Sequence, residues 1–299
     1  SDSSADELSE GIGITPLKYP IGVSLSGYGA RTGRVTPYNQ SLGGSSSVLE
    51  RQDVRALAFD QAGEIQLLIR LPLAWSTDYL RTLIAIELQA LTRSAEHPQG
   101  VNYLDALLIF ATHSHSQPGR FWNLVPDRPL GVLGFGTFSP SITRKYAQVA
   151  AHAAALALED LKPARIGWSM VDEADPERMI HSNRRRSTTQ FDDRLLTMRI
   201  DDLDGHPRAA IVGFGVHGTH FMTPLLTGDA AAGIERIFTE ELSRNWGTFV
   251  PTFFMNGNAG NISPRGDHFT NQKFGHIQTL GALLWEVFKD EFNAITTRS

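Results

Sequence analysis

Three short apolar segments of this sequence each end abruptly in polar residues that can carry chemistry. The segments are residues 107–111, 209–216 and 249–255, and they precede the sequences THSHS, HGTH and NGNAGNISP. Apolar runs of this length, bounded by glycine, proline and asparagine, are typical of buried strands. The chain is therefore expected to form sheets whose strand ends carry imidazole, hydroxyl and amide groups.

The rest of the sequence alternates helical and strand patterns. Helices are predicted at residues 77–91, 139–161, 230–242 and 271–292, and further strands at 54–59, 65–71, 165–171 and 194–200. The turn sequences DQAG (60–63) and DG (204–205) indicate hairpins among these strands. The pattern predicts an α/β fold with mixed β-sheets flanked by helices, in a layered, sandwich-like arrangement rather than one purely parallel sheet.

The chain shows no internal repeat or low-complexity linker, so residues 12–299 are predicted to form a single α/β domain. Residues 1–11 are polar, acidic and without periodicity, and are expected to form a disordered tail. Because the first residue is serine and not methionine, this N-terminus is interpreted as processed or engineered. A removed export signal and a vector boundary explain it almost equally well.

Composition limits the partners and the metal chemistry. With 20% charged residues and a formal net charge of −5, the chain gives no electrostatic reason to expect nucleic acid as a partner. No apolar run reaches the roughly 18 residues that a membrane-spanning helix needs. Because the sequence contains no cysteine, any bound metal must use histidine, carboxylate, tyrosine or carbonyl ligands.

The histidines after the first two segments are candidates for a metal site. In an extended strand residues i and i+2 share a face, so His113 and His115 are expected to project together. They would bind one metal, or one would bind it while the other moves protons; the alternative is a pair of surface histidines. His217 is a candidate for the same centre, whereas His220 is expected beside the site or on the surface.

Ser263 follows the third segment and is interpreted as a nucleophile or a hydrogen-bond donor to substrate. The sequence has no G-x-S-x-G elbow, so a serine-hydrolase triad is not supported. Residues 121–138 form a loop rich in aromatic and aliphatic side chains among glycines and prolines, beginning with Phe121 and Trp122. This loop is expected either to flank an apolar substrate chain or to belong to the core.

Five motifs in this order resemble the N-terminal catalytic region of the neutral/alkaline ceramidase family. They are THSHSQPG (112–119), NRRRS (183–187), VH (216–217), GD (228–229) and NAGNISP (258–264). The resemblance extends from about residue 14 to the last predicted helix. It implies a zinc-dependent hydrolase that cleaves the amide of an N-acyl sphingoid base, a lipid substrate for which peripheral membrane contact is expected. It also favours a secreted or periplasmic location.

The resemblance assigns roles to individual residues. His113 and His217 correspond to the first two zinc ligands, and His115 to the imidazole that acts as acid or base. Arg184 corresponds to the family's active-site arginine, although the two extra arginines after it make the register ambiguous. Ser263 corresponds to the serine of the family's S-P loop.

The family's remaining zinc ligands are a glutamate and a tyrosine beyond that loop, and the last tyrosine of this chain is Tyr146. Either a C-terminal segment or a second chain completes the site, or His220 or Asp229 supplies a third ligand. The isolated chain is then expected to bind zinc weakly and hydrolyse little. The alternative function is a non-catalytic lipid- or partner-binding module, and a serine amidase based on Ser263 lacks a visible base–acid pair.

Overall fold

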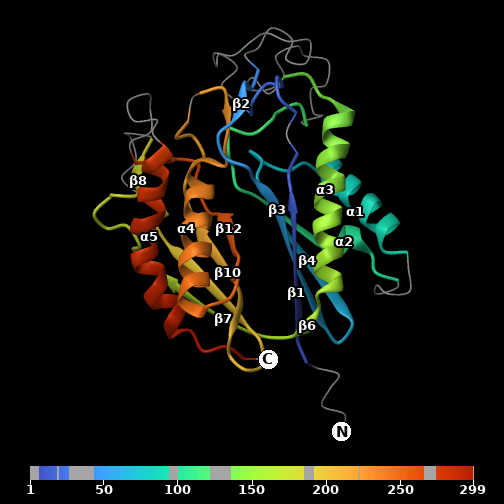
Figure 1. Ribbon diagram of the computed structural model, residues 1–299, viewed down its shortest axis with the longest axis vertical. Helices are drawn as coiled ribbons and strands as arrows, with labels where there is room; N and C mark the ends of the chain where they lie inside the picture. The colour runs from blue at the N-terminus through green and yellow to red at the C-terminus, as the bar shows by residue number, and fades with distance from the viewer. Residues whose placement is uncertain are drawn as a thin grey trace. The chain divides into compact units, whose positions relative to one another are not determined.

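The computed structural model describes residues 7–18, 20–26, 44–93, 100–121, 136–184, 192–221, 223–265 and 274–298. Contacts divide the chain into two compact units (Figure 1). The first contains Glu10–Leu161 and Met222–Gly228, and the second contains Lys162–Phe221 and Asp229–Ser299 with the N-terminal stretch to Ser9. A single domain over residues 12–299 stays a prediction.

The first unit is built on a mixed sheet in which β5, β4, β3 and β1 lie side by side in this order. These strands are β1 (Ser9–Pro16), β3 (Asp53–Gln61), β4 (Glu64–Leu71) and β5 (Leu107–Ala111). The two-residue strand β6 (Lys162–Pro163) belongs to the second unit. Strands β3 and β4 form the predicted antiparallel hairpin, with Gln61 opposite Glu64, and β5 runs parallel to β4. The short strands β2 (Ser47–Val48) and β11 (Leu225–Leu226) pair separately.

Helices α1 (Asp78–Leu91), α2 (Tyr103–Ala106) and α3 (Pro140–Glu159) complete this unit. Thr77 caps α1 by accepting a hydrogen bond from the backbone N–H of Leu80 at 3.1 Å, and Pro140 begins α3. The buried Leu80, Ile84 and Leu88 of α1 and the alanines of α3 pack with β3 and β4 in one hydrophobic core. The predicted helices at 77–91 and 139–161 are confirmed.

The expected tail boundary is wrong, because β1 begins at Ser9 rather than after residue 11. A Cβ on Gly11 would lie 2.1 Å from the carbonyl oxygen of Ala157, and one on Gly13 would lie 1.9 Å from that of Ala153. Strand β1 therefore packs with its bare backbone directly against the alanine-rich face of α3. The sequence does not predict this strand, because glycines replace the alternating apolar side chains by which other strands are identified.

We predict that Gly13→Ala destabilises the protein by about 2 kcal/mol or more, because the added methyl group forces β1 away from α3. Urea unfolding measures this change. Gly275→Ala is the matched control, since Gly275 has open space around its Cβ position and lies in a helix. Equal unfolding midpoints for the two variants would contradict the close packing of β1.

The second unit contains a four-stranded sheet with the order β12-β10-β9-β7. Its elements are β7 (Arg165–Val171), β8 (His181–Asn183), β9 (Leu195–Asp201), β10 (Pro207–Phe214), α4 (Asp229–Trp246), β12 (Thr252–Asn256), β13 (Ile262–Pro264) and α5 (Phe274–Ala294). Strands β10 and β12 are parallel, whereas β9 pairs antiparallel with both β10 and β7. The predicted α/β class with mixed sheets and flanking helices is confirmed.

Helices α4 and α5 run side by side in Figure 1 and cover one face of this sheet. Their close approach depends on glycine, since a Cβ on Gly233 would lie 2.5 Å from the carbonyl oxygen of Ile277. Between the two helices, Phe238 of α4 and Trp285 and Phe288 of α5 form an aromatic cluster with ring centroids 4.3 to 5.6 Å apart. Among the described helices, none combines the length and the apolar character needed to cross a bilayer.

Candidate functional site

The backbone turns sharply at the first histidine of the HSH motif. Strand β5 ends at Ala111. Backbone hydrogen bonding to the segment that follows β4 nevertheless continues, since the N–H of His113 donates to the carbonyl oxygen of Leu73 at 2.9 Å. His113 has φ 63°, in the left-handed region that non-glycine residues seldom occupy. The expectation that strand alternation brings His113 and His115 together is therefore wrong in its reason, since a turn brings them together.

The two imidazoles meet edge to face with their Nε2 atoms 3.4 Å apart. The Nδ1 atom of His113 lies 2.7 Å from the carbonyl oxygen of Ala74, and the Nδ1 atom of His115 lies 2.9 Å from the carbonyl oxygen of Ser26. A carbonyl oxygen only accepts hydrogen bonds, so each Nδ1 carries the proton and each Nε2 presents a lone pair. Metal-binding histidines commonly have this arrangement.

The separation of these lone pairs fits a shared cation. Two lone pairs at 3.4 Å need a proton or a positive ion between them. A tetrahedral zinc ion with Zn–N bonds of about 2.05 Å holds two ligand atoms about 3.3 Å apart. The geometry of His113 and His115 is thus suited to zinc.

Hydrogen bonds among buried groups hold the HSH segment in place. The Ser114 hydroxyl and the Gln117 amide both donate to the carbonyl oxygen of Thr227, at 3.0 and 2.8 Å. The N–H of Ser26 donates to the carbonyl oxygen of Gln117 at 2.8 Å, which fixes the carbonyl group that orients His115. Trp75 lies beside both imidazoles, with ring centroids 6.1 and 6.5 Å away.

His217 belongs to the second unit and follows β10. Its Nδ1 lies 3.0 Å from the carbonyl oxygen of Ala259, so this imidazole also carries its proton on Nδ1 and a lone pair on Nε2. The residue before it, Val216, exchanges hydrogen bonds with the side chain of Asn256 at 3.1 and 2.8 Å. His217 in the second unit, like His113 in the first, therefore carries its proton on Nδ1, the tautomer that leaves Nε2 available to a metal ion.

Ser263 lies on β13 of the second unit, and Arg184 directly follows β8, the strand that pairs with β13. Strands β8 and β13 pair antiparallel with Ser182 opposite Ser263, and the N–H of Arg184 donates to the carbonyl oxygen of Asn261 at 2.7 Å. The Ser263 hydroxyl is fully buried and has no hydrogen-bond partner among the described residues. A buried hydroxyl left in this way costs stability.

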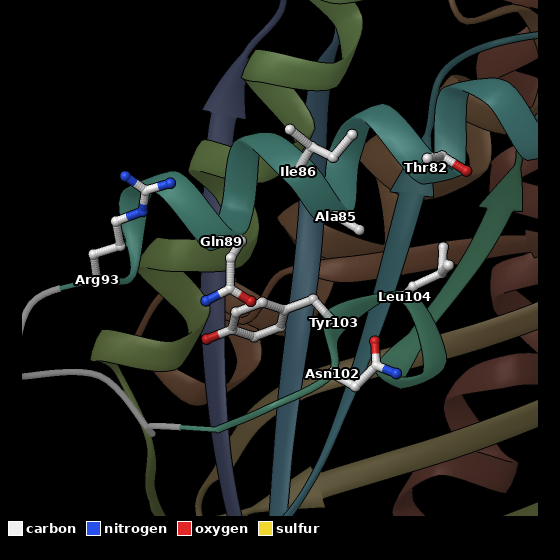
Figure 2. A pocket seen from close by; sticks show the side chains of 8 residues that line it. All are labelled: Thr82, Ala85, Ile86, Gln89, Arg93, Asn102, Tyr103 and Leu104. Carbon is white, nitrogen blue, oxygen red and sulfur yellow. The ribbon is translucent and has the colours of Figure 1, made fainter.

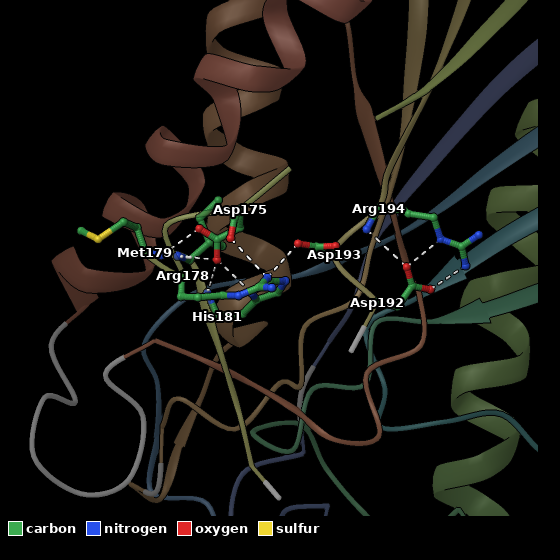
Figure 3. A network of polar contacts seen from close by, with 8 residues as sticks. Asp175, Arg178, Met179, His181, Asp192, Asp193 and Arg194 are labelled. Carbon is green, nitrogen blue, oxygen red and sulfur yellow. Dashed lines mark hydrogen bonds and ion pairs between the residues drawn. The ribbon is translucent and has the colours of Figure 1, made fainter. Parts of the chain in front are cut away.

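A buried aspartate–histidine pair that the sequence did not reveal includes the first residue of β8 (Figure 3). The Asp175 carboxylate lies 2.8 Å from Nδ1 of His181 and also accepts the backbone N–H groups of Met179, Ile180 and His181. Burial raises the pKa of Asp175, but these hydrogen bonds outweigh it and hold the pKa below its usual range.

The Asp175–His181 pair does not complete a serine triad. In the antiparallel register His181 lies opposite Pro264, one residue away from Ser263. Since successive residues of a strand point to opposite faces, the His181 ring and the Ser263 hydroxyl face opposite ways. The structure therefore gives no support to a serine amidase.

Asp192 forms the other half of the network in Figure 3. The guanidinium group of Arg194 contacts both of its carboxylate oxygens at 2.8 and 2.9 Å, and the Asn258 amide donates to it at 2.7 Å. The hydrogen bonds from Arg194 lower the pKa of Asp192, and although burial opposes them, the pKa falls to about 2. Asp192 therefore stays ionised and connects this network to the loop that carries Ala259.

The Asp229 carboxylate is fully buried and accepts the backbone N–H groups of His220, Phe221 and Ala230 at 2.7 to 2.9 Å. Both oxygens are thus engaged in holding the HGTH loop, which favours a structural role. The His220 ring packs against Phe221 and His276, with centroids 5.0 and 4.8 Å away. Metal ligation by His220 or Asp229 stays a prediction.

The two residues expected beside a substrate chain differ in what the structure describes. Phe121 is fully buried and meets Tyr146 of α3 edge to face, with ring centroids 6.2 Å apart, inside the core of the first unit. This packing favours the core alternative for Phe121. Trp122 lies outside the described residues.

A separate groove lies between α1 and α2 (Figure 2) and has a volume of about 310 Å³. The residues that line it are Thr82, Ala85, Ile86, Gln89, Arg93, Asn102, Tyr103 and Leu104. None of the candidate site residues contributes to this groove.

A second group of potential metal-ligand atoms comes from Asp202, Asp204 and His206. It lies at an exposed hairpin turn, where the Asp202 carboxylate accepts hydrogen bonds from backbone N–H groups.

The comparisons with known proteins agree on one relative. No family model matches the sequence. The chain is 26% identical over 268 residues to neutral ceramidase from Pseudomonas aeruginosa, an alignment that covers 83% of this chain and 37% of that protein.

Two solved structures share the fold. The crystal structure of neutral ceramidase from Pseudomonas aeruginosa matches with a TM-score of 0.72 and 18% identity, over 97% of this chain and 45% of that one. A structure described as ceramidase complexed with C2 gives a TM-score of 0.71 and 19% identity, over 97% and 44%. The chain spans less than half the length of each relative.

Proposed function

We propose that this chain, which is similar in sequence and fold to neutral ceramidase, is a zinc-dependent amide hydrolase for an N-acyl sphingoid base or a related N-acyl lipid. The observation that carries the proposal is the pair of Nε2 lone pairs of His113 and His115, 3.4 Å apart, with both Nδ1 protons held by carbonyl groups. A cation bound by His113 would leave Nε2 of His115 beside it, in place to accept or donate a proton.

His113 and His217 are the proposed zinc ligands. Each presents Nε2 as a lone pair because its Nδ1–H donates to a backbone carbonyl oxygen, of Ala74 and of Ala259 respectively. These are also the positions at which the sequence resembles the family's first two ligands. Zinc would supply a Lewis acid for the amide carbonyl and would lower the pKa of a water molecule.

His115 is the proposed acid and base. The Ser26 carbonyl fixes its proton on Nδ1, so Nε2 is the atom that takes a proton from the attacking water. The water oxygen bonds to the amide carbon, the carbon–nitrogen bond breaks, and the same Nε2 returns the proton to the leaving amine. The products are a fatty acid and a sphingoid base.

Arg184 and Ser263 are proposed to stabilise the negative charge that develops on the amide oxygen. A guanidinium group and a hydroxyl group both donate hydrogen bonds to such an oxygen. The absence of a partner for the Ser263 hydroxyl among the described residues supports this role, because substrate would then provide the partner.

We predict that Ser263→Ala lowers kcat by about tenfold while leaving the free energy of unfolding unchanged or higher, since the variant removes a buried, unsatisfied hydroxyl. Steady-state assays and urea unfolding measure the two effects. Ser182→Ala, at the facing position on β8, is the control and is expected to retain kcat. A destabilised Ser263→Ala variant with normal kcat would show that the hydroxyl is structural.

The alternative is a lipid- or partner-binding module of the same fold without catalysis. In this alternative the chain keeps the fold but has lost part of its metal site. A binding module would retain an N-acyl lipid without releasing the amine.

One experiment separates these functions. The purified chain is incubated with Zn²⁺ and a short-chain N-acyl sphingosine, and free sphingosine and bound lipid are both measured. We expect slow release that rises with zinc concentration, stops with a chelator and returns with added Zn²⁺. Lipid binding without release, at a zinc content of one ion per chain, would overturn the proposed activity in favour of the binding module.

A further inference from the structure

We infer that Asn256 is a positioning residue that holds His217 ready for a metal ion; this inference rests on the proposed function. Asn256 is the last residue of β12, and it pairs with Phe214 at the end of the parallel strand β10. After this pair, the segment that leads from β10 to His217 forms hydrogen bonds with the side chain of Asn256 instead of with the backbone of β12.

The amide group of Asn256 makes two complementary contacts with Val216. Its oxygen accepts the Val216 N–H at 3.1 Å, and its nitrogen donates to the Val216 carbonyl oxygen at 2.8 Å. A side-chain amide has the same donor and acceptor as a peptide group, so Asn256 extends the strand pairing up to the residue before His217. The backbone of the histidine is fixed as if it still belonged to the sheet.

The same loop also holds the imidazole ring. Three residues after Asn256, the Ala259 carbonyl oxygen lies 3.0 Å from Nδ1 of His217, and the N–H of Ala259 donates to Gly257 at 2.8 Å. A Cβ on Gly257 would lie 3.2 Å from the backbone nitrogen of Gly215, so glycine lets the loop approach β10 closely. His217 is therefore held at its backbone and at its ring by one short segment.

The chemistry of this position requires asparagine. Aspartate is isosteric but has no donor, and it would place a carboxylate oxygen against the Val216 carbonyl oxygen, where the amide nitrogen now lies at 2.8 Å. Alanine loses both contacts. Asn256 is only partly exposed, so water would replace these hydrogen bonds incompletely.

Loss of this support should release the ring from the Ala259 carbonyl group. A neutral imidazole then populates both tautomers, and the one with its proton on Nε2 cannot bind a metal through that atom. Removing groups that orient a metal-binding histidine typically costs about 10- to 100-fold in metal affinity. Because Asn256 acts through the backbone, we expect the lower end of that range.

The test compares Asn256→Asp and Asn256→Ala with Asn258→Ala in the full chain. Asn258 has the same amide group in the same loop, but it contacts Asp192 instead of Val216. Competition titration with Zn²⁺ is expected to show about a tenfold loss of affinity for both Asn256 variants. Asn258→Ala should stay within about twofold of the wild type, since it leaves the Val216 contacts in place.

A second measurement makes no use of metal. Nitrogen-15 NMR of the metal-free chain, with His217 assigned by comparison with His217→Gln, reports which ring nitrogen carries the proton. The wild type and Asn258→Ala should show Nδ1–H, and the Asn256 variants a mixture of tautomers. Melting temperatures recorded in parallel show whether a variant is merely less stable.

An unchanged tautomer in both Asn256 variants would overturn the inference, even if the variants melt at lower temperature. An equal loss of zinc affinity in Asn258→Ala would also overturn it, because the effect would then belong to the whole loop. A wild-type chain that binds no zinc would instead refute the proposed function, and the tautomer measurement would still decide the role of Asn256.

Discussion

His113→Ala and His217→Ala should each reduce the affinity for zinc by about a thousandfold or more and abolish zinc-dependent hydrolysis, since structural zinc sites gain roughly 10 to 16 kcal/mol from only a few ligands. In each residue a backbone carbonyl oxygen holds the proton on Nδ1, so that Nε2 can bind zinc. The carbonyl group is that of Ala74 for His113 and that of Ala259 for His217. An alanine removes the imidazole, so the carbonyl oxygen no longer has a ring to orient and the ligand atom is lost.

Competition with a chromophoric chelator measures the affinity, and elemental analysis gives the zinc content. His152→Ala is the matched control, because His152 lies exposed on α3, where its Nδ1 contacts Thr15. One stoichiometric zinc ion in either variant would remove that histidine from the ligand set. An experimental structure with the Nε2 atoms of His113 and His217 more than about 6 Å apart would also contradict a shared ion, given Zn–N bonds of roughly 2.0–2.1 Å.

The parts of the fold that the sequence predicts are those in which apolar side chains define the element. Residues 65–71 lie in β4 and residues 107–111 form β5, nearly as predicted, because side chains of both strands belong to the core of the first unit. Strand β1 was missed because its glycines expose backbone to α3, where a Cβ would lie 1.9 to 2.1 Å from a carbonyl oxygen. Strands β8 and β13 were missed because each is only three residues long, too short to show an alternating pattern.

For the candidate site, the sequence likewise predicts some features and not others. The identity of His113, His115 and His217 follows from the sequence, because imidazoles directly after apolar strands are conspicuous. Their protonation does not, since it depends on carbonyl groups far away in the chain, such as that of Ser26 for His115. The Asp175–His181 pair likewise depends on a loop whose backbone N–H groups converge on one carboxylate, which no residue pattern signals.

His115→Ala should leave zinc bound and lower amide hydrolysis by about a hundredfold or more, the usual contribution of a positioned acid–base group. The remaining activity would come from the metal ion and from the groups that stabilise the amide oxygen. The variant removes the imidazole and leaves a space beside Trp75 and His113, whose rings surround it. Imidazole added to the solution should enter this space and restore part of the rate, with no effect on the wild type.

Zinc content and rate together decide between two roles for His115. Its Nε2 lies 3.4 Å from that of His113, a separation that also fits two ligands of one tetrahedral zinc ion, about 3.3 Å. If His115→Ala loses the metal as completely as His113→Ala, His115 is a ligand and another group must move the proton. If zinc stays bound and imidazole restores activity, proton transfer is the function of His115, because a free base can replace a proton carrier but cannot re-create a tethered ligand.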